Sequence, residues 1–220
     1  IRFAPLLSET QDMNCNKVIE ALLNGLERGK KDFGIEYGVI TCAMRHHSEE
    51  ENARMIRTAR AYLGYGVCAA DLAGAESLYP MFMELFKKTK ALGMPFTLHA
   101  GECGSVQNIL DSVEAGAGRI GHGIAMRGHA DIQKELQKKG IGIEMCPISN
   151  LQTKAVESTK DYPMREFLNA GLKVTANTDN RTVSNTTLTK ELEFIQKNYG
   201  ITDEEIHLMM RNAVDVAFAD

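Results

Sequence analysis

The order of the predicted elements is the strongest constraint on the fold, because apolar strands alternate with amphipathic helices and no consecutive hairpin signals occur. Strand patterns occur at 1–5, 37–44, 65–70, 96–98, 119–123, 141–146 and 172–176. Helical patterns occur at 10–31, 48–64, 80–92, 106–115, 131–139, 164–170, 188–198 and 206–217, and 147–150 is predicted as a turn. Strands that alternate with helices in this way form a parallel sheet.

Polar residues or glycines follow most of these strands. They are Asp71 and Gly74, His99 and Glu102, His122, Ser149 and Asn150, and Asp179 and Asn180. Sites built from the carboxyl ends of many parallel strands are typical of the (β/α)8 barrel. A doubly wound sheet usually places its site at one switch point with a glycine-rich first turn, and no GxGxxG follows a strand here. We therefore predict an α/β protein with a TIM-type barrel.

The chain begins Ile1-Arg2-Phe3-Ala4-Pro5, inside a predicted strand and without an initiator methionine. Together with the seven predicted strands, this start suggests a barrel that lacks its first β/α unit. We expect residues 1–220 to be a single catalytic barrel domain, truncated at the N-terminus and also at the C-terminus.

Composition excludes several classes of protein. The 220 residues carry a net charge of −4 and no long basic run, which argues against binding to nucleic acid or to an anionic membrane surface. No apolar run approaches the roughly 18 residues of a membrane span. The five cysteines include no CxxC pair, which fits reduced thiols in the cytoplasm better than a disulfide framework. The oligomeric state stays open.

Two histidines and an aspartate at three strand ends, His99, His122 and Asp179, suit a divalent metal. Imidazole and carboxylate without thiolate are typical of a catalytic zinc site with an open position. Each residue also has a structural interpretation, since His122 lies between two glycines and Asp179 suits a turn or a helix cap. Their shared place at the exits of one barrel favours the metal site.

Five motifs, in this order and spacing, resemble the adenosine deaminase family of the metal-dependent amidohydrolases. They are Asp-Leu-Ala-Gly at 71–74, His-Ala-Gly-Glu at 99–102, Gly-His-Gly at 121–123, Cys-Pro-Ile-Ser-Asn at 146–150 and Asn-Thr-Asp-Asn at 177–180. The resemblance implies hydrolytic deamination of adenosine or 2'-deoxyadenosine in purine salvage, with one Zn²⁺ per active site and a purine nucleoside as the small-molecule partner. The other zinc deaminase design needs HxE followed by PCxxC, and neither occurs here.

The resemblance also implies the role of each residue. His99 and Asp179 are the implied zinc ligands, and Glu102 the implied proton donor to purine N1. His122 is implied to assist deprotonation of the attacking water. Asp179 also orients that water, and the backbone N–H of Gly74 contacts N3.

This sequence departs from the family pattern in two places. The family has an HxH pair on its first strand, which supplies two further zinc ligands, and no HxH occurs in this chain. With His99 and Asp179 alone, we expect weak metal binding or none, because catalytic zinc normally has at least three protein ligands. Asn180 replaces the second of two adjacent aspartates, and its amide donates a hydrogen bond to purine N7 at any pH.

Three alternatives remain open. Adenine or AMP is the substrate in one, with Arg45 and Arg181 as the candidate phosphate ligands for AMP. Another is a purine-binding module, and a third is an inactive fragment. For a fragment we also expect association through exposed strand edges.

Overall fold

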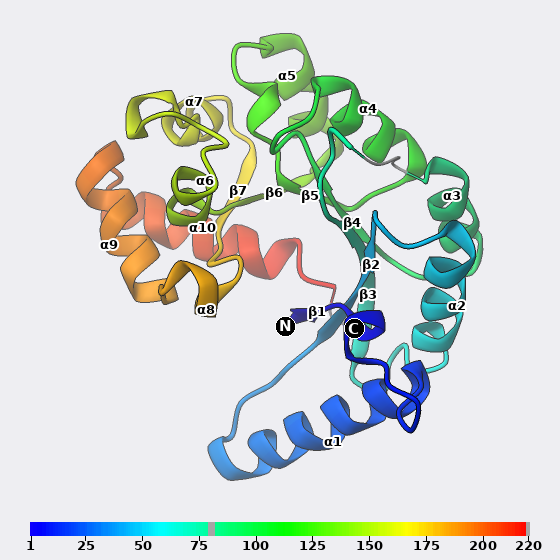
Figure 1. Cartoon of the computed structure of the whole chain (residues 1–220). Helices are drawn as coiled ribbons and strands as arrows, with labels where there is room; N and C mark the ends of the chain where they lie inside the picture. Colours follow the sequence, from blue (N-terminus) through cyan, green and yellow to red (C-terminus); the bar gives the residue numbers. More distant parts are fainter. Residues whose placement is uncertain (79–81, 219–220) are drawn as a thin grey trace. The chain divides into compact units, whose positions relative to one another are not determined.

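The computed structural model describes residues 1–78 and 82–218 (Figure 1). Its strands are β1 (Arg2–Phe3), β2 (Val39–Met44), β3 (Val67–Ala73), β4 (Thr97–Ala100), β5 (Arg119–His122), β6 (Gly142–Met145) and β7 (Lys173–Ala176). Its α-helices are α1 (Cys15–Phe33), α2 (Glu49–Arg60), α3 (Met83–Ala91), α4 (Val106–Ala115), α5 (Ala130–Lys139), α6 (Pro147–Gln152), α7 (Met164–Asn169), α8 (Arg181–Ser184), α9 (Leu188–Tyr199) and α10 (Asp203–Asp215). Short 3-10 helices occupy Pro5–Ser8, Ile124–Met126 and Thr159–Asp161.

All the strand pairs whose register is defined are parallel. The strands pair in the order β1-β2-β3 in one sheet and β4-β5-β6-β7 in a second. The sequence prediction of a parallel α/β fold with strands in these places is confirmed. Chain order equals sheet order, so successive strand ends lie beside one another and bring together the residues that follow them.

The chain divides into two compact units, one formed mainly by Ile1–Leu98 and the other mainly by His99–Val113 and Ala117–Ala217. We call them the first unit and the second unit. The single catalytic domain expected from the sequence stays a prediction.

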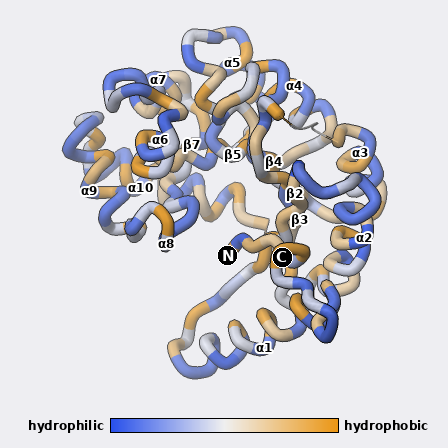
Figure 2. The backbone as a smooth tube through the Cα atoms, in the orientation of Figure 1, coloured by the Kyte–Doolittle hydropathy of each residue, from blue (hydrophilic) through white to orange (hydrophobic). Residues whose placement is uncertain are grey.

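The core of the first unit forms where α1, α2 and α3 pack on β2 and β3. Met55 and Ile56 of α2 and Leu72 of β3 are almost completely buried, and the rings of Phe86 and Phe96 lie 5.1 Å apart. Figure 2 shows hydrophilic and hydrophobic residues alternating along α1, as expected for a helix with one buried face.

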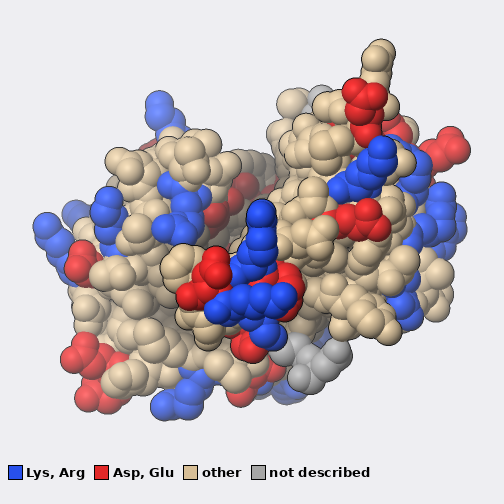
Figure 3. Space-filling view, turned by 90° about the horizontal axis from the view of Figure 1, so that it is seen from below, with Lys and Arg blue, Asp and Glu red and all other residues tan. Residues whose placement is uncertain are grey.

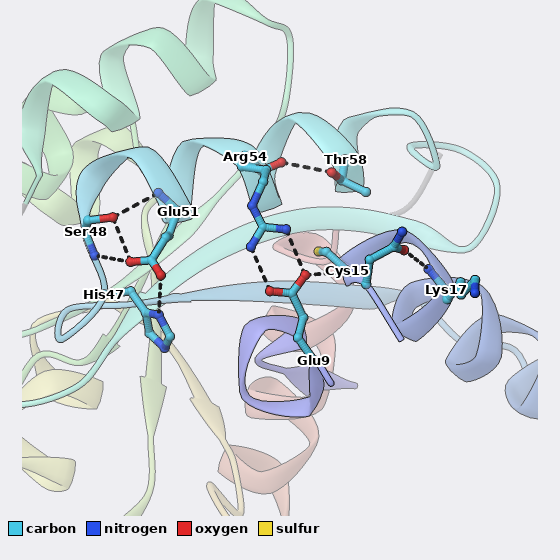
Figure 4. Close-up of polar contacts among 9 residues, drawn as sticks. Glu9, Cys15, Lys17, His47, Ser48, Glu51, Arg54 and Thr58 are labelled. Carbon is cyan, nitrogen blue, oxygen red and sulfur yellow. Dashed lines mark hydrogen bonds and ion pairs between the residues drawn. The ribbon is translucent and has the colours of Figure 1, made fainter. Parts of the chain in front are cut away.

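Side-chain caps fix the start of α2 and its contact with the preceding segments (Figure 4). Ser48 and Glu51 form a capping box, as the sequence predicted. Arg54 binds both carboxylate oxygens of Glu9, at 2.8 and 2.7 Å, and Glu9 also accepts the backbone N–H of Cys15 at the first turn of α1. One carboxylate therefore joins the starts of two helices.

The second unit buries one face of its strands under helices. Ile143 of β6, Val174 of β7 and Ile195 of α9 have no exposed surface. Arg119 forms a 2.6 Å ion pair with Glu144 and donates to the carbonyl of Val216, so the amino ends of β5 and β6 are joined to the residue after α10. Thr202 and Glu205 form the predicted capping box of α10.

Two expectations differ from the structure. The predicted turn at 147–150 was wrong, because Pro147 begins α6 instead. The helix predicted from Pro80 is described only from Met83, and Pro80 itself lies outside the described residues. A further short helix, α8, follows the last strand.

The charged side chains are mixed in sign. On the face drawn in Figure 3, lysines and arginines lie among aspartates and glutamates, in keeping with the net charge of −4. Among the described residues, the helices are either too short or too polar to cross a membrane.

Candidate active site

His99 is the third residue of β4 and lies against the neighbouring strand β5. Its side chain is buried. A Cβ atom at Gly121 would lie 3.2 Å from the His99 Cα and 3.4 Å from its Cγ. The absence of a side chain at Gly121 therefore lets β5 approach the His99 ring closely.

Glu102 follows β4 after a tight turn at Gly101. The φ of Gly101 is +70°, and a Cβ there would lie 2.6 Å from Ile109. Both the backbone angle and the contact require glycine at this position. The turn places the partly buried Glu102 carboxylate with Oε2 3.7 Å from Nε2 of His122.

His122 is the last residue of β5 and is almost completely buried. Its φ is +65°, a left-handed conformation that is unusual for a side chain other than glycine. Burial lowers the pKa of His122, and the neighbouring His99, whose ring centroid lies 5.0 Å away, lowers it further. The ring is therefore neutral at pH 7 and has one nitrogen able to accept a proton.

Asp179 follows β7 and also has a left-handed backbone, with φ +53°. Its Oδ2 accepts a 2.7 Å hydrogen bond from the hydroxyl of Ser149 in α6. Strained backbone at two polar residues of neighbouring strand ends is a feature that functional sites often have. The strain and the hydrogen bond together fix the direction of the carboxylate.

Ligand atoms of Glu102, His122 and Asp179 all lie within 4.8 Å of one another. Three of the four predicted metal-site and proton-transfer residues therefore converge. His99 is not a member of this group, although its ring contacts that of His122. Nitrogen and carboxylate oxygen donors without thiolate fit a zinc ion, so the residues present suit the metal that the sequence implied.

Asn150 joins two of these residues from α6. Its Nδ2 donates to Oε1 of Glu102 at 2.9 Å, and the His122 Nδ1 lies 3.0 Å from Nδ2 and 3.4 Å from Oδ1. The phenol of Tyr162 donates to Oδ1 at 3.3 Å. The sequence identified Ser149 and Asn150 only as strand-exit residues, and it gave no signal for Tyr162, which is distant from every motif.

Two predicted purine-binding residues lie at the ends of other elements. Asn180 caps α8, with Oδ1 accepting the backbone N–H of Val183, so its Nδ2 is the atom that the cap does not use. Gly74 ends β3 in the first unit with φ +114°, and a Cβ there would lie 3.3 Å from Arg45. Their contacts with purine N7 and N3 stay predictions.

Comparison with known proteins places the chain in a family. Its residues 1–220 match the family model described as adenosine deaminase. Adenosine deaminase of Enterococcus faecalis is 39% identical over 220 residues, and that of Clostridium botulinum is 41% identical over 222 residues. The alignments cover 99% and 100% of this chain and 65% and 66% of those proteins, so the chain spans about 65% of the length of these curated relatives.

Solved structures share the fold along the whole chain. Adenine deaminase of Arthrobacter aurescens has a TM-score of 0.88 at 24% identity, with 100% of this chain and 68% of that chain covered. An amidohydrolase of Burkholderia ambifaria with bound zinc has a TM-score of 0.91 at 22% identity, with 100% and 62% covered. The predicted α/β fold, of the TIM-barrel type found in these amidohydrolases, is confirmed. Since the five motifs, the parallel strands and the family match all extend over the same 220 residues, the chain belongs to the adenosine deaminase family.

Proposed function

We propose that the protein carrying this chain hydrolyses adenosine and 2'-deoxyadenosine to inosine and 2'-deoxyinosine, with release of ammonia, in purine salvage. The observation that carries the proposal is the convergence of Glu102, His122 and Asp179 within 4.8 Å. These residues belong to three of the motifs that resemble the family, and curated relatives about 40% identical along the chain are named adenosine deaminases.

His99 and Asp179 are the residues that would hold the metal in this chain. A bound zinc ion would supply hydroxide at neutral pH, because it lowers the pKa of water to about 7. The hydrogen bond from Ser149 leaves the other carboxylate oxygen, Oδ1, available to the metal. Loss of zinc from the His99→Ala and Asp179→Ala variants, measured by metal analysis, would support this assignment.

Glu102 is the proposed proton donor. Attack on C6 of the purine removes the aromaticity of the ring, so the developing charge on N1 must be neutralised by a proton. Glu102 is the only carboxyl group of the three-residue cluster besides Asp179, and Asp179 is engaged by Ser149. Its protonated form would transfer the proton to N1 as C6 becomes tetrahedral.

His122 is proposed to accept the proton of the attacking water. Its lowered pKa keeps the ring neutral at pH 7, as this role requires. Asn180 and Gly74 are proposed to bind N7 and N3 of the purine. No step is proposed in which the protein contacts nucleic acid or membrane, and we infer that the enzyme works in the cytoplasm.

Adenine and AMP are the nearest alternative substrates. Arg45, one of the two candidate phosphate ligands for AMP, is 1% exposed, which argues against a phosphate at this residue. Among the related structures, an Arabidopsis protein is an N6-methyl-AMP deaminase and another is described as a complex with IMP. Deamination rates of the zinc-loaded protein on adenosine, deoxyadenosine, adenine and AMP therefore test the substrate. Absence of turnover on every aminopurine would refute the proposed function.

A further inference from the structure

Asn150 is the polar residue at the centre of the second unit's site. It has no exposed surface, and it comes from α6, which contributes none of the predicted metal or proton-transfer residues. A buried amide must have partners for its carbonyl oxygen and its NH₂ group, because an unsatisfied polar group costs about 1–3 kcal/mol. The partners of Asn150 are all side chains, and two of them belong to the proposed machinery.

The partners on either side set the direction of the amide. Glu102 Oε1 lies 2.9 Å from Nδ2, and a carboxylate can only accept a hydrogen bond. The Tyr162 hydroxyl lies 3.3 Å from Oδ1, and burial raises the pKa of this phenol well above its usual value, so it stays protonated and donates. Nδ2 therefore faces Glu102 and Oδ1 faces Tyr162.

The His122 ring presents Nδ1 to the same amide. A ring N–H at Nδ1 reaches Oδ1 at 3.4 Å, and a carbonyl oxygen can accept both this bond and that of Tyr162. Such contacts are often long in the absence of substrate and shorten in the reacting complex. With its proton on Nδ1, the neutral ring keeps a lone pair on Nε2, the nitrogen that lies 3.7 Å from Glu102 Oε2.

We propose that Asn150 is a positioning residue for the deamination, holding Oε1 of Glu102 through Nδ2 and the Nδ1–H of His122 through Oδ1. The inference rests on the proposed function. It assigns the reacting atoms: Oε2 of Glu102 gives its proton to purine N1, and Nε2 of His122 accepts the proton of the attacking water. The amide contacts neither substrate nor metal and acts through these two side chains.

The test compares Asn150→Ala and Asn150→Asp with the wild type, using the zinc-loaded, full-length protein. Asn150→Ala removes both contacts, whereas Asn150→Asp keeps an acceptor for His122 and removes the donor to Glu102. We expect kcat on adenosine to fall by about 10²-fold in the Asn150→Ala variant with little change in KM, since misplacement of reacting groups by about 1 Å has an effect of this size. Asn150→Asp is expected to lower kcat through Glu102 alone.

Asn212→Asp is the matched control, because Asn212 is also buried in the second unit and donates to the Val174 carbonyl away from the site. We expect it to keep the wild-type kcat. Tyr162→Phe removes only the phenol and should reduce kcat less than Asn150→Ala. Thermal unfolding of each variant separates loss of positioning from loss of folding.

A second readout does not depend on activity. ¹⁵N NMR of histidine-labelled protein, with His122→Gln to assign the resonances, identifies the protonated ring nitrogen of His122. We expect the proton on Nδ1 in the wild type and in Asn150→Asp, and a mixture of tautomers in Asn150→Ala. A wild-type proton on Nε2, or unchanged kcat in both Asn150 variants of an active enzyme, would overturn the inference. A wild type without turnover would refute the proposed function instead.

Discussion

Gly121 gives the His99 ring its room, and this contact makes a test of how tightly the site is packed. A methyl group at Gly121 would lie 3.2 Å from a backbone atom of β4, which cannot move without shifting the strand. We expect Gly121→Ala to lower the free energy of unfolding by about 1–3 kcal/mol, the usual effect of overpacking a core. Urea denaturation measures the change.

Gly25 provides the control for this substitution. It lies inside α1, and a Cβ there would have no atom within 4 Å. Gly25→Ala should raise the free energy of unfolding by about 0.5–1 kcal/mol, because alanine favours the helix over glycine. If both variants change stability in the same direction, the close approach of β5 to His99 is not a packing constraint.

Glu191 is a buried carboxyl group that supports the site from α9. Its Oε2 accepts the backbone N–H of Ile148 at the start of α6, and its Oε1 is buried without a hydrogen-bond partner. Burial raises the pKa of Glu191. The folded state therefore binds this proton more tightly than the unfolded state, and the stabilisation is lost as pH rises from about 4.5 through the raised pKa.

Glu191→Gln should remove this dependence, since a glutamine keeps an acceptor for Ile148 and cannot ionise. We expect the variant to gain stability relative to the wild type as pH rises above about 4.5, measured by urea denaturation at a series of pH values. Glu193→Gln changes an exposed residue of the same helix and should follow the wild type. Parallel curves for wild type and Glu191→Gln would contradict the prediction.

At the scale of elements, the sequence could predict the strands and the longer helices because their signals are local. Ser48 with Glu51 and Thr202 with Glu205 both form the capping boxes that the spacing indicates. The six-residue helix α6 could not be predicted, because its first turn depends on Glu191, which is 43 residues from Ile148 in the chain. A short helix fixed by a distant side chain has no periodic pattern of its own.

The starts of α1 and α2 are joined by one ion pair, between Arg54 and Glu9 (Figure 4). Both side chains are partly exposed, so solvent weakens the attraction, but the two parallel hydrogen bonds need the planar guanidinium. We expect Arg54→Ala to lower the free energy of unfolding by about 1 kcal/mol and Arg54→Lys to recover part of it. Urea denaturation measures both.

Lys87→Ala is the control for this pair. Lys87 forms a single contact with Glu84 within α3, and both side chains are exposed. Its removal should have a smaller effect than Arg54→Ala. An equal effect would mean that Arg54 contributes only as an ordinary surface charge.

For the whole molecule, the motifs predicted which residues gather, and the alternation of elements explained why. Glu102, His122 and Asp179 follow three strands of one parallel sheet, so topology alone brings them together. The hydrogen bonds among them were not predictable, because they depend on the position of α6 and on Tyr162. The same dependence on tertiary contacts applies to His99, which lies beside the three-residue cluster and not within it.

Removal of metal should therefore change the stability of the folded protein as well as its activity. Zinc bound by residues from separate strand ends stabilises only the folded state, and zinc at 100 times its Kd adds about 2.7 kcal/mol to the free energy of unfolding. We expect a chelator to lower the unfolding temperature of the wild type and added zinc to restore it. The His99→Ala variant should unfold at the same temperature with and without chelator, whereas His207→Ala, which changes an exposed residue of α10, should respond as the wild type does. If His99→Ala responds fully and His122→Ala does not, the metal is held by the cluster of Glu102, His122 and Asp179, and His99 is a packing residue beside it.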